Sequence, residues 1–309
     1  MLWRRSPAGL RGHRMKIGLI GLGRMGGAMW RRLREHGFDV VAWDQDEAKA
    51  RAEAVRGLAV AANAREVADR SDVVISIITE DHGVRKLFTG PGGFLGSDVA
   101  GRLFIEMSTL QPTTGRELAA AVAAKGARLI DSPVLGTIPS VRDGKLLAMV
   151  GGAVADVERG RIVLDKLARR IVHMGPVGAG YAMKLAVNLG LGAYIQALSE
   201  SLALGLKQGL HLDQMLDVLR EAPTATNWLA AKIPVLRGEQ ADVSLDLRTL
   251  RKDLMSAVAT GAASGVPTPV AAGALTSLSA AVAGGVGERD LAELARFVRE
   301  HMLQNYEQG

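Results

Sequence analysis

The first half of the chain alternates short apolar runs with longer segments of mixed polarity. The apolar run Met15–Ile20 is expected to form a buried strand, followed by a helix to about His36 and a second strand over Asp39–Asp44. Further strands are expected at 72–78, 102–106, 128–131, 146–150 and 171–173, and helices at 111–125 and 154–168. Strands that are apolar on both faces are typical of a parallel sheet covered by helices on both sides. Residues 15–177 are therefore expected to form a doubly wound, mostly parallel α/β domain.

From Gly178 onward the strand signals stop. Helical patterns cover 178–209, 212–221, 224–236, 248–264, 268–283 and 288–305, punctuated by Pro223, Pro234, Pro267 and Pro269. Residues 178–309 are expected to form an all-α domain. A long segment around 174–199 both ends the first domain and opens the second. Because apolar residues cover nearly all of its circumference, we expect a long interdomain helix that is buried on every side.

That apolar helix contains one charged side chain, Lys184, with Asn188 on the same face one turn later. Burial disfavours an ammonium group and lowers its pKa, so Lys184 is a candidate for proton transfer near neutral pH. The alternative is a Lys whose stem packs while its head reaches water. The length of the helix would allow it to span a membrane, but a charge near its middle makes that costly. We therefore expect no membrane association.

A glycine-rich turn joins the first strand to the first helix. The order is strand, G-x-G-x-x-G, helix, strand and acid, and Asp44 lies 23 residues after Gly21. Glycines at these positions let backbone amides and a helix N-terminus approach a pyrophosphate, while the acid accepts a hydrogen bond from a ribose hydroxyl. The unit predicts a Rossmann-type dinucleotide site made by Gly21, Leu22, Gly23, Arg24, Met25, Gly26 and Asp44. The alternative is that Asp44 only caps the helix that starts near Glu47.

The residues after the second strand favour NAD over NADP. They are Trp43-Asp44-Gln45-Asp46, and a carboxylate here would face the 2′-phosphate of NADP. Lys49 and Arg51 are the alternative, because either could turn inward and bind that phosphate.

Composition excludes several classes of site. The chain of 309 residues has no Cys, which excludes disulfides, thiolate zinc sites and a Cys nucleophile and agrees with a reducing, cytoplasmic location. Its six His are scattered, so we expect no metal site. The formal charge of +6 comes mainly from residues 1–14, which carry four Arg and no acid. The rest holds 34 basic and 32 acidic residues, and no nucleic-acid partner is expected. Residues 1–14 are interpreted as a disordered basic leader, or as a stretch before a natural start at Met15.

Four motifs in order resemble the β-hydroxyacid dehydrogenase family, which includes 3-hydroxyisobutyrate dehydrogenase and the glyoxylate and succinic semialdehyde reductases. They are the glycine loop at 21–26, Asp131-Ser132-Pro133-Val134-Leu135-Gly136-Thr137, the G-x-G-x-x-x-K-x-x-x-N motif at 178–188, and Lys252-Asp253. The resemblance covers about Met15 to Val298. It implies a nicotinamide-dependent oxidoreductase that acts on a small 3-hydroxy acid, semialdehyde or oxo acid.

The resemblance also implies roles for single residues. Lys184 would be the general acid in reduction and the base in the reverse direction. Asn188 would hold the substrate, together with the loop residues Ser132, Gly136 and Thr137. Cofactor contacts would come from Ile78, Thr79, Thr109 and Lys252. For Lys252 the alternative is one solvated face shared with Arg248 and Arg251. Because Lys184 opens the helical domain, it should face a cleft between the domains, where ligands often bind.

The substrate loop departs from the family pattern. Leu135-Gly136-Thr137 stands where many members have Ser-Gly-Gly, so position 135 offers no hydroxyl donor. The alternative is that Thr137 supplies a hydroxyl from a shifted position, and the amides of Gly136 and Thr137 are expected to be available. The apolar Leu135 predicts a more apolar pocket and favours a branched or bulkier carbonyl acid.

Two other functions are weighed against the dehydrogenase. One is an imine reductase on the same architecture, and the other is a non-catalytic dinucleotide-binding module. Relatives with these functions usually lack the Lys at this position, so Lys184 argues against both. Relatives associate through the Ala- and Gly-rich helical domain, so a homodimer or homotetramer is expected.

Overall fold

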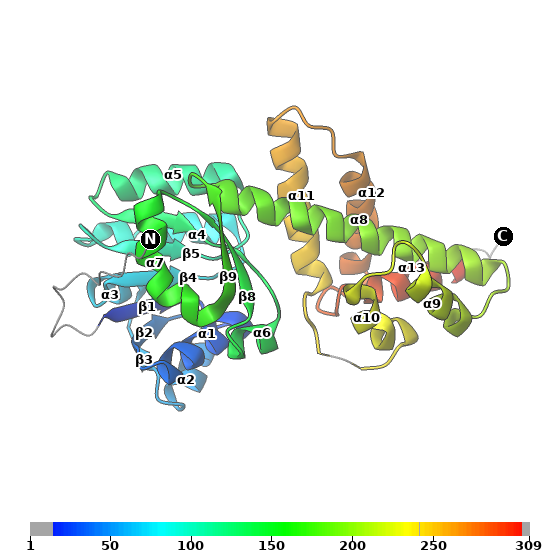
Figure 1. The fold of residues 1–309 in the computed structure, drawn as a ribbon, viewed down its shortest axis with the longest axis horizontal. Helices are drawn as coiled ribbons and strands as arrows, with labels where there is room; N and C mark the ends of the chain where they lie inside the picture. Colours follow the sequence, from blue (N-terminus) through cyan, green and yellow to red (C-terminus); the bar gives the residue numbers. More distant parts are fainter. Residues whose placement is uncertain (1–14, 241, 305–309) are drawn as a thin grey trace, which may run out of the picture. The chain divides into compact units, whose positions relative to one another are not determined.

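The structure, a computed structural model, describes residues 15–240 and 242–304, with side chains described to residue 301. The leader expected at 1–14 lies outside these residues. The chain divides into two compact units, one up to Tyr181 and one from Ala182 (Figure 1). The boundary falls in the first turn of a long helix, whereas the sequence suggested Gly178, just before that helix.

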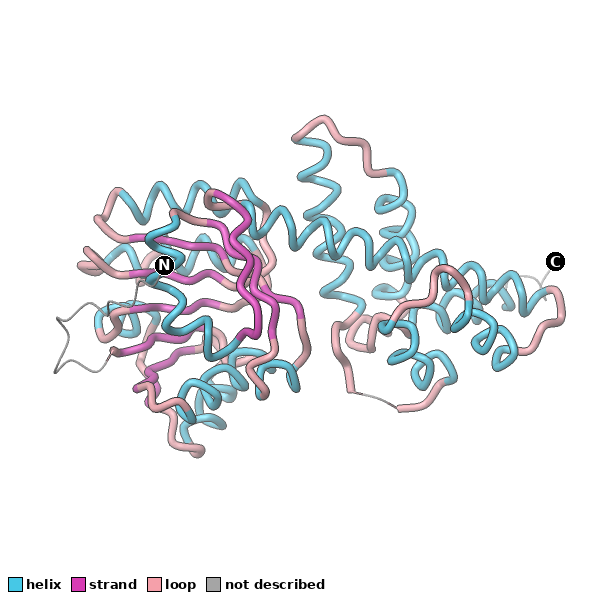
Figure 2. Tube along the Cα trace, viewed as in Figure 1, coloured by secondary structure: helices cyan, strands magenta, loops and turns pink. Residues whose placement is uncertain are grey.

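The first unit is built on one sheet (Figure 2). Its strands are β1 (Lys16–Ile20), β2 (Asp39–Trp43), β3 (Ala59–Val60), β4 (Val73–Ser76), β5 (Leu103–Glu106), β6 (Arg128–Asp131), β7 (Val134–Leu135), β8 (Leu146–Gly151) and β9 (Ala168–Gly175). Their order is β3-β2-β1-β4-β5-β6-β8-β7, with β9 beside β8. Neighbours from β3 to β6 are parallel, and β8 runs antiparallel to both β6 and β7. This confirms the mostly parallel, doubly wound α/β fold.

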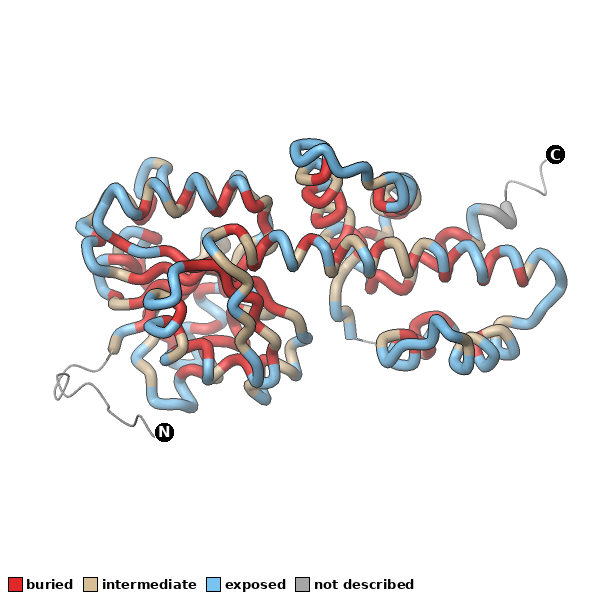
Figure 3. The backbone as a smooth tube through the Cα atoms, turned by 45° about the horizontal axis from the view of Figure 1, so that its top comes forward, coloured by how far each residue is buried: buried red, intermediate tan, exposed pale blue. Residues whose placement is uncertain are grey.

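Both faces of the central strands are apolar, so the sheet is buried between two helical layers (Figure 3). On β5, Leu103 and Ile105 enter one core while Phe104 enters the other, as the two-residue period of a strand requires. The first core is covered by α1 (Arg24–Glu35), α2 (Glu47–Ala54), α6 (Ile138–Arg142) and α7 (Val154–Leu167). The second is covered by α3 (Ala64–Asp69), α4 (Asp81–Thr89), the 3₁₀ turn η1 (Phe94–Gly96) and α5 (Pro112–Ala123).

The second unit is helical in its described part. Its helices are the part of α8 (Ala179–Lys207) beyond Tyr181, α9 (Leu212–Glu221), α10 (Asn227–Arg237), α11 (Leu247–Ala263), α12 (Pro269–Ala283) and α13 (Glu293–Gln304). Residues from all six form one apolar core, to which α8 contributes Ile195, Leu198 and Leu202. A buried ion pair joins α10 to the segment before α13, with Lys232 Nζ at 2.6 Å from Asp290 Oδ2.

Three details differ from the sequence prediction. The strands β3 and β7 are two residues long, too short to leave a periodic signal. The helix expected at 224–236 begins three residues later, at Asn227, and ends at Gly238 in the left-handed conformation, with Pro234 inside it. The last helix begins at Glu293, five residues later than expected. Asp290 lies before it in a turn, where its carboxylate pairs with Lys232 and accepts a hydrogen bond from the Ala292 amide.

The prediction that α8 is buried on every side is wrong. Met183 is 37% exposed and Leu204 is 66% exposed, while Ala182, Ala186 and Gly190 are also exposed. Exposed and buried Ala and Gly residues both occur along this helix, the buried ones including Gly192 and Gly205. By length and composition alone, α8 is long and apolar enough to cross a membrane. In its most apolar stretch of 18 residues, 39% of the residues are buried inside the protein. The apolar side chains that it does bury form the core of the second unit.

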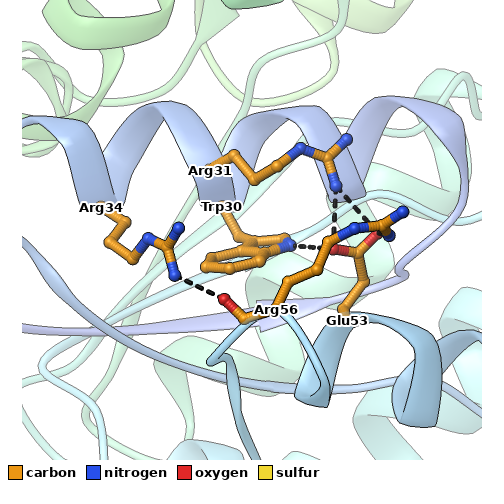
Figure 4. Close-up of polar contacts among 5 residues, drawn as sticks. All are labelled: Trp30, Arg31, Arg34, Glu53 and Arg56. Carbon is orange, nitrogen blue, oxygen red and sulfur yellow. Dashed lines mark hydrogen bonds and ion pairs between the residues drawn. The ribbon is translucent and has the colours of Figure 1, made fainter.

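A buried carboxylate fixes α2 against α1 (Figure 4). Glu53 accepts hydrogen bonds from Trp30 Nε1, Arg31 and Arg56, each at 2.8–2.9 Å. Burial alone would raise the pKa of Glu53, but the hydrogen bonds from Arg31 and Trp30 and the charges of Arg31 and Arg56 outweigh it, and the pKa lies below its ordinary value. A carboxyl group with a lowered pKa stabilises the fold at neutral pH and loses that contribution as the pH falls through its folded-state pKa.

We therefore expect Glu53→Ala to lower the free energy of unfolding at pH 7 by about 2–3 kcal/mol, because it strands a buried indole N–H and two guanidinium groups. The difference from wild type should shrink toward pH 3. Urea denaturation at both pH values measures it, and Glu47→Ala is the control, since the Glu47–Arg51 pair on the same helix is exposed. Equal losses for the two variants would contradict the role given to Glu53.

Candidate active site

The glycine loop between β1 and α1 is shaped by two close backbone approaches. Gly21 has φ +93°, and a Cβ there would lie 2.1 Å from the Ile77 carbonyl oxygen. A Cβ on Gly26 would lie 1.8 Å from the carbonyl oxygen of Gly21. A Cβ on Gly23, in contrast, would have no atom of the described chain within 4 Å. Two of the three glycines are therefore required by packing, and the third borders open space.

The N-terminus of α1 faces that open space without a side-chain cap. Gly23 is the N-cap residue and has no side chain that could accept from the first-turn amides, and the first turn contains no acid. Uncapped amides and the helix dipole make such an end a binding site for an anion such as a pyrophosphate. Gly23 and Arg24 are exposed, and Met25 is half-buried. Leu22 differs, because its side chain is 4% exposed and packs in the core.

Asp44, directly after β2, holds this loop. Its Oδ2 accepts from the Leu22 amide at 2.6 Å, and its Oδ1 accepts from the Asp46 amide at 2.8 Å. Asp46, and not Asp44, caps α2, since its side chain accepts from the Ala48 amide. The alternative that Asp44 is a helix cap is therefore wrong. Lys49 and Arg51 form ion pairs with Asp46 and Glu47 along α2.

The loops after β4 and β5 lie at the same edge of the sheet as the glycine loop. The Ile78 side chain would lie 3.2 Å from a Cβ on Gly21, and the Ile78 amide donates to Ser108 Oγ at 2.9 Å. Thr79 is exposed and Thr109 is half-buried. The carboxyl edge of an open α/β sheet is where ligands bind. The structure thus brings together the glycine loop, Asp44, Ile78, Thr79 and Thr109 on one unit.

The carboxylate of Asp131 anchors the first turn of α8. It ends β6 and accepts from the Gly178 amide at 2.7 Å and from the Tyr181 amide at 2.9 Å. Burial raises the pKa of Asp131, against these backbone hydrogen bonds, which lower it. A Cβ on Gly180 would lie 2.3 Å from the Met149 carbonyl oxygen and 2.5 Å from Asp131 Oδ2. The absence of a side chain at Gly180 therefore lets this end of α8 pack closely against the sheet.

The substrate loop expected at 131–137 is only partly accessible within the first unit. Ser132 is completely buried, and its hydroxyl has no hydrogen-bond partner among the described residues. Leu135 is half-buried, while Gly136 and Thr137 are exposed. The Thr137 amide donates to Ser140 Oγ at 3.2 Å and Thr137 is the N-cap residue of α6. The Thr137 amide is therefore already used within the loop and is not available to a substrate as expected. Gly136 lies on the surface of the loop.

Lys184 and Asn188 belong to a cluster in the second unit that joins α8 to α11. Asn188 is buried and its Nδ2 donates to Asp253 Oδ2 at 2.6 Å. The other oxygen of Asp253 lies 2.7 Å from Lys252 Nζ, in an ion pair whose side chains are 2% and 21% exposed. Lys252 therefore does not lie in a solvated row with Arg248 and Arg251. Arg248 pairs with Glu288, and Arg251 donates to Ser279.

The electrostatics of this cluster suit proton transfer. Burial lowers the pKa of Lys184, the Asp253 carboxylate opposes that shift, and the nearby Lys252 charge adds to it. A Lys with a lowered pKa changes its charge closer to neutrality and can act as an acid or a base. Asn188 is fixed by Asp253 with its amide nitrogen toward the carboxylate. The cluster therefore sets a Lys with a lowered pKa beside an amide of fixed orientation.

Three buried acids hold candidate site residues in place, and none of them was predicted to have a role of its own. They are Glu106, Asp131 and Asp253, and each is at most 1% exposed. Asp131 and Asp253 stand in sequence motifs and Glu106 ends a predicted strand, but all three bond partners that lie 30 to 65 residues away. Among the described residues, no group of three or more His, Asp or Glu is placed to hold a metal ion.

Comparison with known proteins gives two family matches that follow one another along the chain. Residues 16–175 match the NAD binding domain of 6-phosphogluconate dehydrogenase, and residues 178–298 match the NAD-binding domain of NADP-dependent 3-hydroxyisobutyrate dehydrogenase. The first match covers the sheet with its glycine loop, and the second covers the helices that carry Lys184 and Asp253.

Two similar proteins that match over almost their whole length are named as a dehydrogenase and a reductase. The chain is 33% identical to 2-(hydroxymethyl)glutarate dehydrogenase of Eubacterium barkeri, over 91% of this chain and 94% of that protein. It is 31% identical to glyoxylate/succinic semialdehyde reductase 1 of Arabidopsis thaliana, over 93% of this chain and 100% of that protein. Among solved structures, Mycobacterium tuberculosis 3-hydroxyisobutyrate dehydrogenase with L-serine superposes with a TM-score of 0.82 at 28% identity, over 93% of this chain and 100% of that one.

The glycine loop allows packing and ligand binding to be separated by mutation. Gly23→Ala should leave the melting temperature unchanged, because its Cβ meets nothing in the chain, but should weaken dinucleotide binding at least about tenfold by blocking the approach to the helix amides. Gly26→Ala should instead destabilise the fold by about 1–3 kcal/mol through its clash with Gly21. Thermal melts and NADH fluorescence titrations of both variants test this. A Gly23→Ala variant that binds NADH as tightly as wild type would show that the glycine loop is not part of the dinucleotide site.

Proposed function

We propose a function from the family to which the chain belongs, the β-hydroxyacid dehydrogenases. The chain transfers a hydride between a nicotinamide cofactor and a small hydroxy acid, or the corresponding semialdehyde or oxo acid. The observation that carries this proposal is the cluster of Lys184, Asn188, Asp253 and Lys252, in which a Lys with a lowered pKa stands beside a fixed amide. An imine reductase or a non-catalytic dinucleotide-binding module has no evident use for that arrangement.

The first unit supplies the cofactor site in this proposal. The uncapped end of α1 and the glycine loop would bind the pyrophosphate, Asp44 lies where the adenosine ribose is expected, and Ile78, Thr79 and Thr109 would border the rest of the dinucleotide. When bound, a nicotinamide ring supplies or accepts the hydride. The residues of the chain provide position and a proton.

Lys184 has the role of proton donor and acceptor. In the direction of reduction, its ammonium group donates a proton to the carbonyl oxygen, which becomes the hydroxyl of the product. In the reverse direction, the neutral amine takes that proton back. Asn188 holds the oxygen of the substrate through its amide while Asp253 fixes the orientation of that amide. Lys252 forms an ion pair with the other oxygen of Asp253 at 2.7 Å, which helps to fix that carboxylate in place.

The substrate loop favours a branched or bulkier acid. Leu135 places an apolar side chain where many family members have a hydroxyl, and the Thr137 amide is already used by Ser140. The amide of Gly136 is the remaining donor that we assign to the carboxylate of the substrate. A screen of 3-hydroxy acids, semialdehydes and glyoxylate with both cofactors would identify the substrate, and cofactor binding without turnover of any of them would favour the binding module.

We also propose that the protein is a homo-oligomer that associates through its helical unit. Leu204, Leu210 and Val218 are each more than half exposed at the end of α8 and in the segment that follows it. Exposed apolar side chains grouped in one unit are typical of an association surface.

The proton-transfer role of Lys184 is tested by activity as a function of pH. Lys184→Ala should lose about two to four orders of magnitude in kcat, the usual contribution of a general acid–base group, with little change in cofactor affinity. In the wild type, kcat/KM for reduction should fall as the pH rises through the lowered pKa of Lys184, and oxidation should rise over the same range. Both dependences should vanish in the variant.

Lys184→Arg is the matched control, because it keeps the charge but cannot release a proton near neutrality. It should rescue little activity. Turnover of either variant close to that of wild type, with an unchanged pH profile, would rule out this assignment.

For the cofactor, we propose a preference for NAD. The Asp44 carboxylate would stand against a 2′-phosphate, and Lys49 and Arg51 are paired with other acids on α2. One unfavourable charge contact of about 1–3 kcal/mol gives about ten- to hundredfold discrimination in kcat/KM between NADH and NADPH. Steady-state kinetics with one carbonyl substrate measures it.

The variant that tests this selection combines Asp44→Asn with Gln45→Arg, and Gln45→Arg alone keeps the carboxylate that holds the loop. The double variant should move the ratio toward NADPH by at least about tenfold. A wild type that prefers NADPH would refute the proposal, and a double variant without a shift would show that Asp44 is not the selector.

A further inference from the structure

Three polar residues form a row across the buried sheet. Ser76 ends β4, Glu106 ends β5 and Asp131 ends β6, and the three are paired in register. Each follows by two positions a residue of the core under α3, α4 and α5, namely Val74, Phe104 and Leu129. Because side chains two apart on a strand share a face, the row lies on the α4–α5 side, at the carboxyl edge of the sheet.

Glu106 is the centre of this row and has no exposed surface. Its Oε2 is hydrogen-bonded to Ser76 Oγ, and its Oε1 accepts from the Ser108 amide at 2.7 Å. Ser108 is itself buried, and its hydroxyl accepts from the Ile78 amide at 2.9 Å. A single carboxyl group therefore connects the end of β4, the loop after β5 and, through Ser108, the loop after β4. Those two loops carry Ile78, Thr79 and Thr109.

We propose that Glu106 is a positioning residue of the cofactor site, whose buried carboxyl group fixes the loops after β4 and β5 and senses the charge of the nicotinamide ring bound against them. This inference rests on the proposed dinucleotide site in the first unit. A buried acid of purely structural use would need only its hydrogen bonds, but this one also holds the two loops at the carboxyl edge of the sheet, where ligands bind to open α/β sheets.

The charge of Glu106 changes in the physiological range. Burial raises its pKa to about 7, against the hydrogen bonds from Ser108 and Ser76, and the carboxylate of Asp81 at the start of α4 raises it further. The other titratable groups on this face are Tyr181, whose pKa is raised by burial and by the charges of Glu106 and Asp131, and Asp131 itself. The oxidised nicotinamide ring carries a positive charge that the reduced ring lacks. An ionised Glu106 therefore favours the oxidised cofactor, and a neutral Glu106 removes that preference.

The test compares the affinities of the oxidised and reduced cofactor between pH 6 and 8.5. In the wild type, Kd for NADH divided by Kd for NAD⁺ should rise about three- to tenfold over this range as Glu106 ionises. Glu106→Gln keeps the acceptor for Ser108 and a hydrogen bond to Ser76 but has no charge, so its ratio should stay within about 1.5-fold. Glu117→Gln, an exposed carboxylate on α5, is the matched control and should behave as wild type.

Positioning is tested separately from charge by Glu106→Ala. Loss of both hydrogen bonds should raise KM for the cofactor at least about tenfold and change kcat at saturating cofactor less than about threefold, and Glu106→Gln should restore KM. Thermal melts of the variants check that they fold. Because the pKa of Glu106 is raised, its protonated form stabilises the folded wild type at low pH, and this contribution is lost as the pH rises through about 7. Glu106→Gln should therefore not be less stable than wild type at pH 8.

The outcomes are distinguishable. A wild-type protein that binds neither NAD nor NADP would overturn the proposed function and this inference with it. A wild type that binds, together with a Glu106→Gln variant whose affinity ratio changes with pH as the wild type does, would overturn the charge-sensing part alone. A Glu106→Ala variant that melts at a lower temperature but keeps its KM would reduce Glu106 to a structural residue.

Discussion

The loops at the carboxyl edge of the sheet leave backbone amides outside the strand ladder, and the first unit depends on buried and half-buried acids to accept from them. Asp44 accepts from the Leu22 amide, Glu106 from the Ser108 amide, and Asp131 from the amides of Gly178 and Tyr181. An unpaired buried N–H costs about 1–3 kcal/mol, so each carboxylate is needed where it stands. Each acid ends its strand or follows it directly. The same edge therefore gains both its shape and its concentration of negative charge from one requirement of the backbone.

This arrangement explains why some of the molecule could be predicted from the sequence and some could not. Strand and helix periods are local, so the α/β order, the switch to helices near Gly178 and the bounds of α9 and α12 followed from the sequence almost to the residue. Short elements such as β3 and β7 carry no period, and Pro234 remains inside α10 because its neighbours in the core outweigh its local preference. Exposure along α8 also depends on what covers the helix, which no pattern in the helix itself records.

For the candidate site, motifs identified the residues but not their partners. The spacing of Lys184 and Asn188 placed both on one helical face, and the structure adds Asp253 as the group that holds Asn188 and pairs with Lys252. In the glycine-rich motif before Lys184, the spacing gives no reason for Gly180, which the approach of Met149 and Asp131 supplies. Such contacts join residues tens of positions apart, so a single sequence carries no local signal for them.

The anchoring of α8 by Asp131 has a consequence for the order in which the chain folds. The Asp131 carboxylate accepts from the amides of Gly178 and Tyr181, which lie 47 and 50 positions later in the chain. The elements β8, α7 and β9 lie between Asp131 and these amides. Contacts so distant form only after the chain between them has closed into a loop, and loop closure costs entropy before it is repaid. We therefore expect the first turn of α8 to be completed only after β6 and β8 have paired. Pulse-labelled hydrogen exchange at the Gly178 and Tyr181 amides would record when that happens, since both are protected by the same carboxylate.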